Sequence, residues 1–85
     1  MNEVETRIVA IITDLLERSD HGDLAVTPDV RLHGEDGLGL DSLETAELSA
    51  ILEDELGTDP FGAGLLPETV GEVMAFYADQ AAATA

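Results

Sequence analysis

Apolar residues recur every three or four positions in three stretches of the chain, and this spacing predicts three amphipathic helices. We expect the first over about residues 3–18, the second over about 42–56 and the last from about residue 70. A polar residue that can cap a helix precedes each stretch, with a glutamate three positions later that can accept from the cap's own amide. These capping pairs are Asn2 with Glu5, Asp41 with Glu44, and Thr69 with Glu72.

The connection between the first two helices is long and is interrupted by proline and glycine. Its apolar residues stand two or more positions apart, a spacing that could also indicate a strand. The sequence offers no second strand to pair with it, so we interpret these residues as anchors that hold an ordered loop against the helices. The anchors are Leu24, Val26, Val30 and Leu32.

A short apolar segment, residues 60–66, lies between the second helix and the last. Asp59 followed by Pro60 can cap and start a short helix there. Gly62 and Gly64 weaken such a helix, so a tight apolar turn is the alternative.

These elements predict an all-α fold, a small four-helix bundle of three main helices and one short helix, with a long loop between helices 1 and 2. A chain of 85 residues suits one domain with a modest core. We assign residues 1–80 to this domain and expect the alanine-rich residues 81–85 to fray.

Acidic residues dominate the charge of the chain. It has 19 aspartates and glutamates against three arginines, for a formal net charge of −16, and no basic residue except histidine follows Arg31. Such a surface repels nucleic acid and anionic membranes and attracts basic protein surfaces. The alternative is that the charge only keeps a small protein soluble.

Two absences narrow the possible chemistry further. The chain has no cysteine, so it forms no disulfide, and any thiol chemistry needs an imported thiol. No apolar run approaches the roughly 20 residues that span a bilayer, and no basic leader precedes the first helix. We therefore expect a cytoplasmic protein.

The second helix presents two different faces when its residues are placed 100° apart. One is an apolar stripe of Leu48, Leu52 and Leu56 that should face the core. The other is a shallow apolar strip rimmed by carboxylates, which suits transient docking to a basic partner, although an ordinary solvated face is the alternative. We call it the docking strip; its residues are Leu43, Ala46, Glu47, Ala50, Glu53 and Asp54. Ile51 fits neither face.

Ser42 stands at the start of the same helix, directly after the expected cap Asp41. Its hydroxyl would lie beside unpaired backbone N–H groups, where a phosphate is favoured. A plain helix-start serine is the alternative.

Catalysis and metal binding have little support in the sequence. The only histidines are His21 and His33, and no Gly-x-Ser-x-Gly elbow surrounds Ser42, which argues against a serine hydrolase. The acidic loops lack the spacing of an EF-hand. We expect no catalytic residue and no specific metal site.

The segment Leu-Gly-Leu-Asp-Ser-Leu of residues 38–43, followed by an acidic helix, resembles the phosphopantetheine attachment motif of acyl carrier proteins. The resemblance covers most of the chain. It includes the first apolar helix and three further matches, which are Thr27-Pro28, Glu53-Asp54-Glu55-Leu56 and Thr69-Val70. The sequence departs from the common pattern in a longer loop before Leu38 and in the glycine-rich segment 61–66.

The resemblance implies that Ser42 receives 4′-phosphopantetheine from coenzyme A through a separate phosphopantetheinyl transferase that uses Mg²⁺. The terminal thiol of this arm then holds acyl groups as thioesters. Asp41 and Leu43 would contribute to recognition by the transferase. The docking strip would bind basic surfaces of acyltransferase, ketosynthase or ligase enzymes. The protein would be a monomeric carrier without catalysis of its own.

Several functions stay open at this point. The main interpretation is a free-standing acyl carrier of a bacterial polyketide or other specialised pathway. A carrier of fatty acid synthesis, and a discrete aminoacyl or peptidyl carrier, are alternatives within the family. The alternative from another class is an acidic helical adaptor without a prosthetic group.

Overall fold

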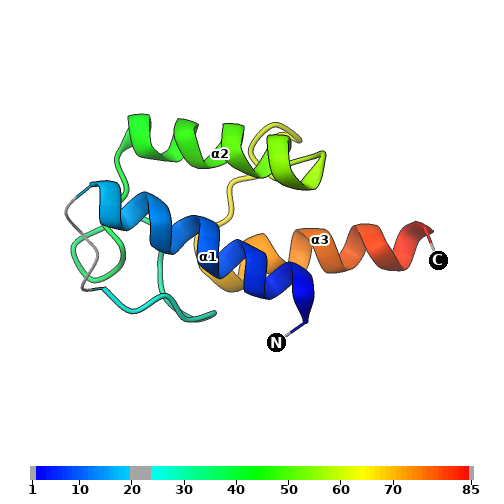
Figure 1. The fold of residues 1–85 in the computed structure, drawn as a ribbon, viewed down its shortest axis with the longest axis horizontal. Coiled ribbons are helices and arrows are strands. Elements are labelled where there is room, and N and C mark those ends of the chain that lie inside the picture. The colour runs from blue at the N-terminus through cyan, green and yellow to red at the C-terminus, as the bar shows by residue number, and fades with distance from the viewer. Residues whose placement is uncertain (1, 20–23, 85) are drawn as a thin grey trace.

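The computed structural model describes residues 2–19 and 24–84, and these form three helices. They are α1 (Glu3–Arg18), α2 (Ser42–Leu56) and α3 (Val70–Thr84). α1 packs against both of the other helices (Figure 1). The all-helical fold and the bounds of the first two helices are thereby confirmed. No helix in the described ranges is long and apolar enough to cross a membrane.

The helices begin at the capping pairs that the sequence predicts. At α1, the Asn2 side chain accepts from the amide of Glu5 at 2.8 Å, and the Glu5 carboxylate accepts from the amide of Asn2 at 3.0 Å. At α3, the Thr69 hydroxyl accepts from the amide of Glu72 at 3.2 Å, and the Glu72 carboxylate accepts in return at 2.9 Å. Each pair satisfies two amides that a helix start would otherwise leave unpaired.

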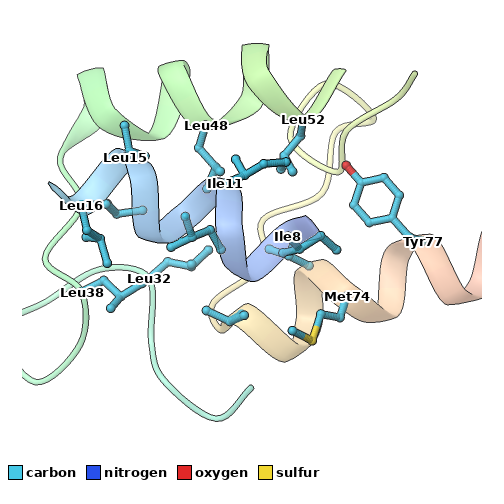
Figure 2. Packing of buried hydrophobic residues seen from close by; sticks show 14 residues of the cluster. Ile8, Ile11, Leu15, Leu16, Leu32, Leu38, Leu48, Leu52, Met74 and Tyr77 are labelled. Atoms are coloured by element: carbon cyan, nitrogen blue, oxygen red, sulfur yellow. The ribbon is translucent and has the colours of Figure 1, made fainter. Parts of the chain in front are cut away.

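The core is built almost wholly from aliphatic side chains of the three helices and of the loop before α2 (Figure 2). Each fully buried side chain of this size stabilises the fold by roughly 1.5–3 kcal/mol. The fully buried members of the core include Ile8, Ile12, Leu15, Leu16, Leu32, Leu38, Leu48, Leu52, Val70 and Val73. The predicted core stripe of α2 is thus confirmed for Leu48 and Leu52, with Leu56 half-buried beside them.

Ile51 has a place that the helical pattern of α2 alone did not reveal. It is half-buried against the core cluster and lines a shallow hollow together with Ala10 and Ile11 of α1. α1 packs against α2 and covers part of this side chain. Ile51 therefore belongs to the contact between the two helices.

The loop before α2 is fastened to the start of α3 by backbone hydrogen bonds. The amide of Leu32 donates to the carbonyl of Glu68 at 2.9 Å, and the amide of Val70 donates to the carbonyl of Val30 at 3.1 Å. The predicted anchors are confirmed for Leu32, which is buried, and for Val26 and Val30, which pack partly buried against the core. Leu24 is 38% exposed and does not serve as an anchor.

The described residues do not show the expected short fourth helix; residues 60–64 form a single capped turn instead. The Asp59 carboxylate accepts from the amide of Gly62 at 2.7 Å, which starts the turn. The turn ends at once because Gly64, at φ 88°, lets the amide of Leu65 bond back to the carbonyl of Pro60 at 2.9 Å. A start signal and a stop signal only five residues apart leave room for one turn.

The end of the chain continues α3. The helix runs to Thr84 and so includes most of the segment expected to fray. Fraying of residues 81–85 stays a prediction, and Ala85 lies outside the described residues.

Candidate functional site

Ser42 is the first residue of α2, and its side chain is exposed. Asp41 caps the helix: its carboxylate accepts from the amide of Glu44 at 2.7 Å, and the Glu44 carboxylate accepts from the amide of Asp41 at 3.1 Å. The amides of Ser42 and Leu43 lie in the same first turn, where a helix leaves its N–H groups without an internal acceptor. The predicted capped helix start with an exposed serine is confirmed.

The residues just before Ser42 hold this helix start in place. Leu38 and Leu40 are buried, and their amides donate to the carbonyls of Arg31 at 2.8 Å and of Leu32 at 3.0 Å. Gly39 lies between them at φ 69°, a conformation that glycine adopts without strain. The buried leucines therefore fix the point at which the chain emerges at Ser42.

Ser42 opens onto a hollow of about 620 Å³. The start of α2, the loop residue His33 and the connection before α3 form its walls. Leu40, Phe61, Leu66 and Pro67 give it an apolar side. The remaining lining residues are polar: His33, Asp41, Ser42, Thr45 and Glu68.

His33 forms a hydrogen bond with Thr45 near the start of α2. No hydrogen bond of the described residues joins it to Ser42. Its Nε2 atom lies 3.0 Å from the Thr45 hydroxyl oxygen, and that hydroxyl lies 2.8 Å from the carbonyl oxygen of Asp41, to which it donates. The sequence did not single out Thr45, because a threonine inside a helix gives no signal of a loop partner. His21, the other histidine, lies outside the described residues.

The docking strip predicted on α2 is exposed along its whole length. Leu43, the largest apolar side chain of the strip, is 68% exposed. The other members, Ala46, Glu47, Ala50, Glu53 and Asp54, are exposed as well. The placement of these six residues on one accessible surface of α2 agrees with the prediction, whereas their binding to a partner stays a prediction.

Two further leucines are exposed, and one of them, Leu66, lines the hollow. Leu65 is 51% exposed and Leu66 is 88% exposed, in the segment that follows the turn of residues 60–64. The apolar turn that the sequence offers as an alternative contains both leucines, but the pattern gives no signal of their exposure.

Asp59 is a buried carboxylate that does more than cap the turn, the role expected from the sequence. It is only 3% exposed and accepts from the hydroxyl of Ser49 at 2.8 Å as well as from the amide of Gly62. Nearby, the Tyr77 hydroxyl, seen at the tip of its ring in Figure 2, donates to the carbonyl of Thr58 at 2.8 Å. Burial, and secondarily the charge of Asp59, raises the pKa of Tyr77 to about 12.

The described residues contain no group of three or more histidine, cysteine, aspartate or glutamate side chains arranged to hold a metal ion. Comparison of the chain with family models, with curated proteins and with solved structures found no match. Inference about function therefore rests on the motif of residues 38–43 and on the geometry around Ser42.

Proposed function

We propose that this protein is an acyl carrier protein that holds its cargo on a 4′-phosphopantetheine arm attached to Ser42. The observation that carries the proposal is the position of Ser42: an exposed hydroxyl at the first residue of a helix whose start is capped by Asp41 and Glu44, opening onto the hollow. Two buried leucines of the motif, Leu38 and Leu40, hold that position.

The surroundings of Ser42 fit a phosphodiester with a chain attached. The first-turn amides of α2 and the positive end of the helix dipole favour a negative group at this point. The hollow is lined by apolar residues, among them Phe61 and Leu66, and by polar residues, among them His33 and Thr45. A pantetheine chain, which alternates amides with short apolar links, suits a hollow of this mixed character.

The prosthetic group would supply what the chain lacks. The sequence contains no cysteine, and the terminal thiol of the arm forms the thioester with the acyl cargo. The protein's own contribution is to present Ser42 to a phosphopantetheinyl transferase, with Asp41 and Leu43 beside it as recognition residues. In this proposal the chain is a substrate of its partner enzymes and not an enzyme.

The docking strip would serve these partners. Its carboxylates Glu47, Glu53 and Asp54 would attract a basic surface, and the exposed Leu43 would give the contact its register. Partners of this kind include acyltransferase, ketosynthase and ligase enzymes. A net charge of −16 argues against nucleic acid as an alternative partner.

The finer assignments belong to the same proposal. The single turn of residues 60–64 takes the place of the short fourth helix of the carrier bundle. A monomeric cytoplasmic carrier of a bacterial polyketide or other specialised pathway is the preferred form, with fatty acid synthesis or aminoacyl transfer as alternatives.

The proposal is tested by incubating the purified protein with coenzyme A, Mg²⁺ and a promiscuous phosphopantetheinyl transferase and measuring the intact mass. We expect one phosphopantetheine on the wild-type protein and none on the Ser42→Ala variant. The Ser49→Ala variant, which removes another serine of α2, is the matched control and should be modified normally. An unmodified wild-type chain would instead favour the acidic adaptor.

A further inference from the structure

Among the described residues that line the hollow beside Ser42, His33 is the only one whose side chain can become positively charged. None of the three arginines lines the hollow, although Arg31 pairs with Glu68, which does. Arg7 pairs with Glu55, Arg18 with Asp14, and Arg31 with Glu68, at 3.5, 3.4 and 3.8 Å. Of the described lining residues, His33 is therefore the one that can offer a positive charge to a negative group at Ser42.

The hydrogen bonds around Thr45 determine which nitrogen of His33 carries a proton. The Thr45 hydroxyl lies 2.8 Å from the carbonyl oxygen of Asp41, which can only accept, so the hydroxyl proton is used there. The hydroxyl oxygen then accepts from Nε2 of His33 at 3.0 Å. His33 is thus held as a donor at Nε2, and the neutral ring leaves Nδ1 to take up a second proton.

The same contact places the ring close to Ser42. Thr45 stands three residues after Ser42 on α2, and side chains with this spacing lie on the same side of a helix, about 5–6 Å apart at their Cβ atoms. A phosphorus atom bonded to the Ser42 hydroxyl oxygen would extend into the hollow that His33 also lines.

We infer that His33 binds the phosphodiester at Ser42. The protonated ring of His33 holds the phosphodiester along the hollow, and the Thr45 hydroxyl supports the ring. This inference rests on the proposed attachment at Ser42. A phosphodiester keeps one negative charge throughout the neutral range, whereas histidine changes its charge between about pH 5 and 8. The contact is therefore stronger with the ring protonated than with the ring neutral.

The carboxylates on the elements that carry or face the ring could also move the ³¹P resonance, but they are unchanged in His33→Gln, so a step that this variant loses does not come from them. They are Asp41 and Glu44 on α2, Glu68 before α3, and Glu35 and Asp36 on the loop that carries His33.

The experiment follows the ³¹P resonance of the modified protein from pH 5 to 8. We expect a single step in its chemical shift, lost in His33→Gln and kept in His21→Gln. Thr45→Val, which removes the support of the ring, should reduce the step, while Thr45→Ser should keep it. In the unmodified protein, ¹H–¹⁵N spectra of the ring should show the Nε2–H tautomer.

The outcomes separate this inference from the proposed function. If mass spectrometry shows no phosphopantetheine on Ser42, both are wrong. If Ser42 is modified but the ³¹P step is missing, or persists in His33→Gln, the role of His33 is refuted and the carrier function stands. A step that Thr45→Val leaves unchanged, or an Nδ1–H tautomer, would overturn the supporting role of Thr45.

Discussion

Replacement of Asp59 by alanine should strongly destabilise the protein. The carboxylate is 3% exposed and joins α2 to the turn of residues 60–64 through two hydrogen bonds, from the Ser49 hydroxyl and from the amide of Gly62. Alanine removes the cap of the turn and leaves the half-buried Ser49 hydroxyl without its acceptor.

The expected magnitude follows from these two losses. A lost capping residue costs about 0.5–2 kcal/mol, and a polar group left unsatisfied in a buried site costs about 1–3 kcal/mol. We expect a total near 3 kcal/mol, which at about 4–8 °C per kcal/mol for a domain of this size lowers Tm by about 12–24 °C.

Urea unfolding followed by circular dichroism measures this loss, with Asp59→Asn as the matched control. The asparagine carbonyl can accept both hydrogen bonds without a charge, so it should cost only about 1 kcal/mol. A double-mutant cycle with Ser49→Ala isolates the contribution of the hydroxyl. If Asp59→Ala costs less than about 0.5 kcal/mol, within the range of ordinary surface substitutions, the assigned role of the carboxylate is wrong.

Three further predictions concern other parts of the molecule. Gly57→Ala should cost about 1 kcal/mol in urea unfolding, because φ is 85° there although a Cβ would meet no atom, and Gly57→Asn should cost less. Tyr77 is the sole tyrosine, so absorbance at alkaline pH reports its pKa of about 12 directly. The folded protein keeps that proton longer than the unfolded chain does, and the associated stability is therefore complete below about pH 10 and lost between about pH 10 and 12. Asp59→Asn should lower this pKa. Glu47→Lys with Glu53→Lys should slow acyl transfer from partner enzymes at low salt, and equal rates would argue against the docking strip.

The helices and their starts could be predicted because the relevant signals are local. Each capping pair spans three residues, and the core positions of α1 and α2 follow the helical period. Ser42 at the start of α2 depends on the same local pattern, which explains why its exposure and its cap agree with the prediction.

The features that the sequence did not reveal depend on contacts between distant residues. The contact of His33 with Thr45 and that of Asp59 with Ser49 join residues 12 and 10 positions apart. Ile51 gains its burial from α1, which a helical wheel of α2 cannot include. The short helix expected at residues 60–66 became one turn, because Gly64 adopts a left-handed conformation directly after the Asp59 cap has started it.

The carrier function depends most directly on where phosphopantetheine is attached. After incubation with coenzyme A, Mg²⁺ and the transferase, cleavage after Glu35 and Glu44 releases residues 36–44, in which Ser42 is the only hydroxyl-bearing side chain. If Ser42 is the attachment site, this peptide alone carries the added mass. An unmodified 36–44 peptide, or added mass on any other peptide, would contradict it.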